Sequence, residues 1–150
     1  MGTTTFSGPV YAGTIKDPIP LSNLGTVVLE QDVLVAFNGT LVQTASFNIP
    51  AYAQILNITV DPLTAYNSAT SATLAVGTSS GDTSYASGVD VKGSTTRVIP
   101  TFTTTQLTNM QSVGTNTTVV ATVTSVGQPT AGNALVAVFY AQNVNSVSNS

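Results

Sequence analysis

Residues 44–49 read Thr-Ala-Ser-Phe-Asn-Ile, so Ala45, Phe47 and Ile49 alternate with three polar residues. A period of two places alternate side chains on opposite faces of an extended chain, which predicts a β-strand with one face in a core and one in water. Thr on the wet face favours the same conformation, because a β-branched side chain suits extended backbone without needing burial. Antiparallel sheets commonly have one dry and one wet face, so the stretch favours an antiparallel sheet.

The same period recurs in three further segments along the chain. Their expected core positions are Leu56, Ile58 and Val60; Ala72, Leu74 and Val76; and Val119, Ala121 and Val123. Stretches rich in Gly, Pro and Asn separate the alternating segments, and little of the chain has a helical period. This pattern predicts an all-β protein, namely an antiparallel β-sandwich. The expected strands number roughly eight, which suits a jelly roll.

One turn signal conflicts with the hydrophobic pattern. Asn38-Gly39 is the sequence most typical of a two-residue type I′ hairpin, which needs positive φ at both residues, so it predicts direct pairing of the strands on either side. In that register Glu30 and Asp32 fall on the apolar face of the partner strand. Either a β-bulge turns both carboxylates outward, which is the interpretation preferred here, or both lie beyond the buried part of the sheet.

Three weaker local signals complete the prediction. Gly127–Asn133 predicts a second hairpin leading into residues 134–140. Asp82 is expected to cap a single helical turn that ends at Gly88. A short helix is expected to contain Leu107, Met110 and Val113.

The composition excludes most catalytic chemistry. The chain has three basic residues, six acidic residues and no His, Cys or Trp. Without His, a serine or threonine nucleophile lacks the usual base that titrates near neutral pH, so we expect no enzymatic activity. Without Cys there is no disulfide and no thiolate metal site. Glu30 and Asp32 could in principle hold a cation or act as an acid–base pair, but a calcium site needs six or more oxygen ligands, and we expect neither a metal nor a cofactor.

The low charge also restricts the possible partners. With a net charge of −3 and no cluster of Lys or Arg, the chain has no surface suited to nucleic acid. The longest wholly apolar run, Ala134–Ala141, is too short to span a membrane as a helix. We therefore expect no nucleic acid and no membrane among its partners.

Several of the few charged residues lie between positions 82 and 97. They are Asp82, Asp90, Lys92 and Arg97. One interpretation is a solvated loop with weak surface ion pairs, each contributing on the order of 0–1 kcal/mol. The other is a subunit contact in which Asp90, Lys92 and Arg97 fix the register, and both interpretations stay open.

The tyrosines could instead form a platform for a sugar. Tyr11 and Tyr85 are the candidates expected to be exposed, whereas Tyr140 shares a face with Val136 and Val138 and is expected in the core. Glycan sites on β-sandwiches usually use Trp as well, and this chain has none.

Residues 1–25 differ from the rest, because Gly and Pro interrupt any periodicity. They are either a frayed terminus or an extended arm that lies along another chain, since Thr and Phe favour extended backbone and Pro blocks helix. The division expected is an arm over 1–25 and a β-sandwich domain over 26–150. The candidate contact residues in the arm are Thr3, Thr4, Thr5, Phe6, Pro9 and Tyr11.

Three stretches together resemble small structural proteins of tailed phages, including phages of cyanobacteria. They are Gly2-Thr-Thr-Thr-Phe-Ser-Gly-Pro-Val with Ala12-Gly-Thr-Ile; Ala75-Val-Gly-Thr with Tyr85-Ala-Ser-Gly-Val-Asp-Val; and Pro129-Thr-Ala-Gly-Asn-Ala-Leu-Val-Ala-Val-Phe-Tyr140. The group is that of the head-decoration, or cement, proteins.

The resemblance implies a jelly-roll-like domain on the exterior of the phage head, where it clamps adjacent subunits of the major capsid protein. It implies a homotrimer and no catalytic residues. The alternative is a receptor- or glycan-binding knob of a head or tail fibre, which would expose aromatic residues on its loops.

Overall fold

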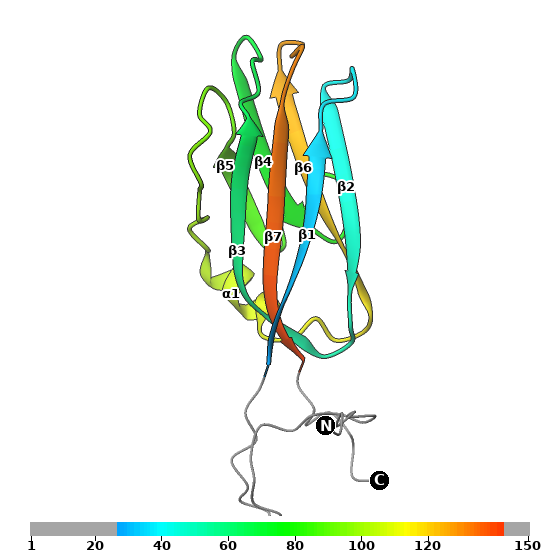
Figure 1. The fold of residues 1–150 in the computed structure, drawn as a ribbon. Coiled ribbons are helices and arrows are strands. Elements are labelled where there is room, and N and C mark those ends of the chain that lie inside the picture. The colour runs from blue at the N-terminus through cyan, green and yellow to red at the C-terminus, as the bar shows by residue number, and fades with distance from the viewer. Residues whose placement is uncertain (1–26, 143–150) are drawn as a thin grey trace, which may run out of the picture.

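A computed structural model describes residues 27–142, which form two antiparallel sheets packed face to face with one short helix at one end (Figure 1). The elements are β1 (Val28–Ala36), β2 (Val42–Ile49), β3 (Ala53–Thr64), β4 (Ser71–Gly77), β5 (Ala86–Asp90), α1 (Thr104–Met110), β6 (Thr117–Val126) and β7 (Asn133–Gln142). The predicted all-β sandwich is confirmed. None of the helical residues in the described part forms a helix long and apolar enough to cross a membrane.

The strand order is that of a jelly roll. The three-stranded sheet has the order β1-β7-β3, and the four-stranded sheet has the order β2-β6-β4-β5. Along the sequence, the β4–β5 pair lies between the strands of the β2–β6 pair, which in turn lies between the strands of the β1–β7 pair. One long hairpin rolled up into two sheets has this nested pairing. The remaining nested partner, next to β3, is reduced to an isolated bridge in which Val60 and Val98 exchange backbone hydrogen bonds of 2.9 and 2.8 Å.

The two predicted hairpins are wrong. β1 and β2 belong to different sheets, and so do β6 and β7, so both connections cross from one sheet to the other. Asn38 does form a local turn, in which its side-chain oxygen accepts the N–H of Thr40 at 3.2 Å. The two crossovers lie together, because the N–H of Phe37 donates to the carbonyl of Gly132 at 2.9 Å. Gly39 has the expected positive φ of 88°, but Asn38 does not, so the predicted type I′ turn does not form. Pairing between distant strands decided the neighbours.

The same topology resolves the position of the two carboxylates on β1. Glu30 and Asp32 pair with Phe139 and Ala137 of β7, and both side chains are exposed. They point outward because Val35, at the opposite phase of the strand, is in the core. The expected outward orientation is correct, but the bulge in a β1–β2 hairpin is not its cause.

The core lies between the sheets and follows the predicted alternation with one exception. The expected core residues of β4 and β6 are all buried, and so are Ile58 and Val60 of β3. Leu56 is 44% exposed, because the register of β3 against β7 shifts between Ile55 and Asn57. Such a bulge changes the phase of the strand, so Ile55 takes the core position that was assigned to Leu56.

One of the two predicted helices is present. Thr103 caps α1 through a reciprocal pair of hydrogen bonds with Gln106, and Met110 packs into the core. Asp82 caps no helix. Its carboxylate accepts the backbone N–H groups of Thr78 and Ser84 at 2.7 and 3.1 Å, which shapes the loop that leads into β5.

Tyr66 links β1 to the segment that follows β5. Its hydroxyl donates to the carbonyl of Val35 at 3.0 Å, and its backbone pairs with the chain at Lys92. Gly132 lies against its ring so closely that a Cβ there would overlap it. Burial raises the pKa of Tyr66 to about 12 from 10.0.

We expect Tyr66→Phe to lower the free energy of unfolding by about 0.5–1.5 kcal/mol at neutral pH, because one buried hydrogen bond is lost. The folded-state pKa lies above the unfolded value, so the contribution of the buried neutral phenol is complete below pH 10 and is lost as the pH rises toward 12. The variant should therefore lose less stability than the natural chain between pH 10 and 12, measured by urea unfolding.

The matched control is Tyr52→Phe, since Tyr52 is 51% exposed. It should change stability by less than about 0.5 kcal/mol and leave the pH dependence unchanged. Equal effects of the two variants would contradict the role given to Tyr66.

Candidate functional site

Charged and apolar side chains gather on the outward face of the three-stranded sheet, which we call the acidic face. β1 supplies Glu30, Asp32 and Leu34 to this face, because Val33 and Val35 occupy the inward phase of the strand. The paired register places Leu34 opposite Leu135 and Glu30 opposite Phe139 of β7. The acidic face consists of Glu30, Asp32, Leu34, Asp61, Arg97, Leu135 and Phe139.

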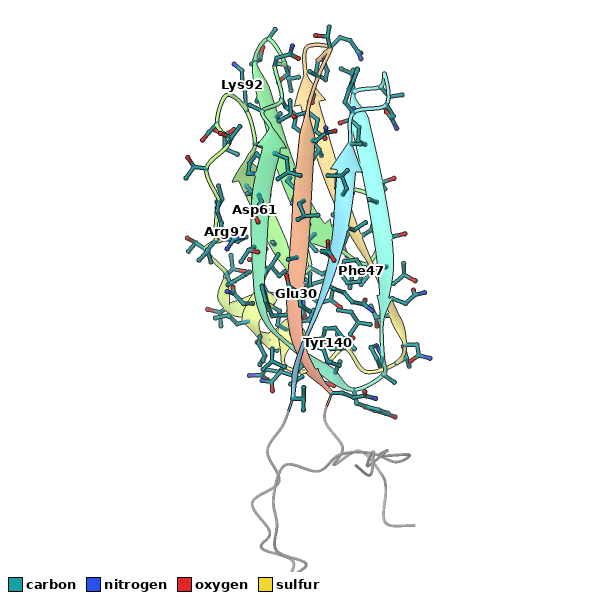
Figure 2. All side chains as sticks on the ribbon, in the orientation of Figure 1. Glu30, Phe47, Asp61, Lys92, Arg97 and Tyr140 are labelled. Carbon is teal, nitrogen blue, oxygen red and sulfur yellow. The ribbon has the colours of Figure 1, made fainter. Side chains whose placement is uncertain are left out.

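An ion pair between Asp61 and Arg97 lies at the β3 edge of this face. The guanidinium of Arg97 donates to both oxygens of the Asp61 carboxylate, at 2.6 and 2.8 Å. The bridge between Val60 and Val98 brings the two residues together, since each is adjacent to a bridge residue. The hydrogen bond from Arg97 lowers the pKa of Asp61, and its effect exceeds the opposing one of partial burial. Asp61 in turn raises the pKa of Arg97. Figure 2 shows both side chains beside β3.

The face carries an excess of negative charge. Asp61 is balanced by Arg97, whereas neither Glu30 nor Asp32 forms an ion pair with any residue between 27 and 142. Glu30 does add to the electrostatic stabilisation of the Arg97 cation, after the larger effect of Asp61. Two carboxylates therefore remain available to a positively charged group from outside the described chain.

The charged residues predicted to act together are separated by the fold. Arg97 lies at the three-stranded sheet, whereas Asp90 ends β5 at the edge of the other sheet. The ammonium group of Lys92 donates to the carbonyls of Ala69 and Thr70 at 3.1 and 3.2 Å, and the Asp90 carboxylate accepts the N–H of Lys92. The charges are local anchors of loops in this structure, and a role in subunit contacts stays a prediction.

The candidate contact residues of the arm lie outside the described residues. They are Thr3, Thr4, Thr5, Phe6, Pro9 and Tyr11.

The outward face of the four-stranded sheet is chemically different. It presents mostly hydroxyl groups, and the register aligns the exposed Thr73 with Thr124 across neighbouring strands. Thr122, opposite Thr44, is 1% exposed, because its hydroxyl accepts the N–H of Gly81 at 3.0 Å under the loop before β5. At the lower end of this face the hydroxyl of Thr118 donates to the side-chain oxygen of Asn48 at 2.8 Å. This face is the one that the alternation of Thr with apolar residues predicted.

The expected sugar platform does not form from the described tyrosines. Tyr85 is only 4% exposed, which corrects its predicted exposure, and Tyr140 is in the core as expected. Tyr66 is also buried, so Tyr52 is the exposed tyrosine in the described range. A pocket of about 240 Å³ beside α1 is lined by Thr78, Ser84, Tyr85, Asn109, Ser112 and Val113. No cluster of three acidic residues suited to a metal ion occurs within residues 27–142.

Sequence reasoning identified Arg97 as a candidate contact residue but missed its ion pair with Asp61 and the apolar part of the acidic face. Asp61 and Arg97 are 36 positions apart, and the sequence carries no signal that pairs them. Leu135 and Phe139 lie in the continuous apolar run of β7, where no alternation marks which residues point outward. Glu30 and Asp32 were identified, and the two-residue spacing that places them on one face of a strand is confirmed.

No protein-family model and no curated protein matches the chain. Among solved structures, the chain is similar to one described as the cyanophage Pam1 capsid asymmetric unit. The identity is 23%, the TM-score is 0.55, and the match covers 95% of this chain and 100% of the other. This similarity shows that the two chains share a fold.

We expect Asp61→Asn to lower the melting temperature by roughly 1–3 °C at pH 7, because a bidentate but exposed ion pair is lost. The pKa of Asp61 in the folded chain lies below its ordinary value of 3.8, so its contribution is present above pH 3.8 and is lost as the pH falls through the folded-state pKa. The difference between the variant and the natural chain should narrow as the pH is lowered below 3.8. Asp90→Asn, which leaves this ion pair intact, is the control, and a difference of equal size at pH 7 and pH 2 would contradict the assignment.

Proposed function

We propose that this protein is a structural component of a phage head, bound to the outer surface and clamping adjacent subunits of the major capsid protein. The observation that carries the proposal is the shared fold with a chain of a phage capsid, which extends over 95% of this chain and all of the other. A match of whole chain to whole chain means that the fold is used there as a complete unit. The same proposal places the protein in the virion.

The chemistry of the described chain suits this role. Its charged groups are few, and those that form hydrogen bonds hold loops and strands in place. We propose that it is not an enzyme and needs no cofactor. A shell protein needs a surface that resists proteolysis and packs against neighbours, and a paired, low-charge sandwich supplies both.

We also propose a homotrimer, in which each copy contacts its neighbours head to tail around a three-fold axis. Three linked copies on a symmetric site gain roughly 10²- to 10⁴-fold in avidity over a single contact. This gain compensates for the modest strength of each contact.

The alternative is a receptor- or glycan-binding knob of a head or tail fibre. The pocket beside α1 offers hydroxyl and amide groups, but the Tyr85 ring at its wall is 4% exposed and cannot stack on a sugar. This geometry favours the head protein over the knob.

The full chain should bind purified phage heads that lack it and raise the temperature at which those heads release their DNA. Removing residues 2–20 should weaken binding while the sandwich stays folded, because the strands begin at Val28. Phe6→Ala should reproduce part of the loss, since burial of a Phe side chain contributes roughly 1.5–3 kcal/mol. Co-sedimentation with heads measures binding, and circular dichroism checks the fold. A truncated chain that binds as tightly as the full one would contradict the arm.

Sedimentation equilibrium tests the assembly separately. We expect a trimer at micromolar concentration or, where free copies dissociate, three copies per site on the head. A monomer in both settings would exclude the trimer without excluding binding to heads.

A further inference from the structure

We propose that the acidic face docks on a patch of another protein that combines Lys or Arg residues with apolar side chains. Under the proposed function, on which this inference rests, that protein is the capsid shell. The inference adds which side of the sandwich is turned toward the shell and what chemistry the shell presents to it.

Charge is the first argument for a partner. Glu30, Asp32 and Asp61 face outward on the sheet and Arg97 balances only one of them. Glu30 and Asp32 are two positions apart on one strand, so their carboxylates point to the same side. Exposed acidic groups of this kind steer a basic partner and fix its orientation more than they add to affinity.

The charge also decides which partner fits. The whole sequence contains only three basic residues, Lys16, Lys92 and Arg97. Arg97 is held by Asp61, and Lys92 is held by backbone carbonyls of residues 69 and 70. A second copy of this chain therefore lacks a described basic patch to offer, and two acidic faces would repel each other. The complementary surface belongs to a different protein.

The apolar side chains on the same face are the second argument. Leu34 lies directly opposite Leu135 in the register of β1 and β7, and it is 45% exposed. Phe139 is half-buried on the same outward side of β7, opposite Glu30. Apolar groups rimmed by charge are typical of a protein interface.

The other sheet provides an internal comparison. Where the middle of its strands faces water, the chain uses Thr, as at positions 44, 73 and 124, and its exposed apolar residues Val42 and Val126 stand at strand ends. Thr would suit β1 and β7 equally well, because it favours extended backbone and tolerates solvent. Leu34 and Leu135 depart from that usage at equivalent outward positions. The departure is explained if their side chains are covered in the assembly.

Matched variants of the full chain test the charge. Glu30→Gln combined with Asp32→Asn should lower the affinity for purified heads about 2- to 30-fold, as expected for two exposed ion pairs. Thr44→Gln combined with Thr73→Asn places the same two amides on the outward face of the four-stranded sheet and should have no effect. Binding of the natural chain should weaken as salt rises from about 0.05 to 0.5 M, because screening shortens the range of charge interactions, and the double variant should show a smaller change.

Matched variants also test the apolar part. Leu34→Thr should weaken binding, whereas Val126→Thr, a change at an equally exposed outward position of the four-stranded sheet, should not. Thermal unfolding followed by circular dichroism confirms that all variants are folded. These positions are exposed, so the substitutions should change stability by less than about 0.5 kcal/mol.

Cysteine labelling locates the covered face independently. The natural chain has no Cys, so single variants Leu34→Cys and Thr44→Cys each introduce one reactive thiol. The rate of maleimide modification is followed by the increase in mass of this chain. When the chain is bound to heads, the rate should fall for the Cys variant at position 34 and stay unchanged for the Cys variant at position 44. Protection at 44 but not at 34 would overturn the inference.

The outcomes separate the two proposals. If the natural chain binds heads and the acidic-face variants bind equally well, this inference is wrong and the proposed function stands. If the natural chain does not bind heads at all, both are wrong. Loss of binding in the variant with Thr44→Gln and Thr73→Asn alone would move the contact to the four-stranded sheet and overturn the inference.

Discussion

The position of β7 between β1 and β3 is the constraint on which the rest of the sandwich depends. The last strand of the described chain pairs with the first over their whole lengths, from Val28 with Ala141 to Ala36 with Asn133. It pairs on its other edge with β3. Once these two ladders form, β2 and β6 must lie together in the second sheet, because both crossovers start from the same end. Loop closure opposes such distant pairing, but the apolar core that these ladders bury outweighs both that cost and the turn preference near residue 38.

The same arrangement creates the acidic face. β7 is apolar on both sides, and its inward residues, including Val136 and Val138, complete the core. Its outward residues, Leu135 and Phe139, then lie in the middle of a sheet whose edge strands contribute carboxylates. A strand with two apolar faces is normally covered on both. The helix of this fold lies at one end of the sandwich and leaves the outer side of β7 open (Figure 1).

The two outward surfaces give the domain two different properties. The hydroxyl-rich face of the four-stranded sheet suits permanent contact with water, because its side chains can bond to solvent or to each other. The acidic face combines charge with apolar area, which suits contact with a second protein. The two sheets share one core, but their outward faces therefore differ in chemistry. A capsid-bound protein has the same requirement, since one side meets the shell and another meets solvent.

The sequence by itself determined the class of fold and most of the core. Alternation in residues 44–49, 72–76 and 119–123 fixed which side chains face the core, because a strand offers only two faces and apolar groups leave water. The spacing of Glu30 and Asp32 likewise placed both on one face. Only the tertiary structure decided which strands pair, which residue of the bulge at Ile55 and Leu56 is buried, and that Asp61 meets Arg97. These outcomes depend on contacts between segments that are distant in the chain. A local sequence pattern does not show which distant segments come into contact.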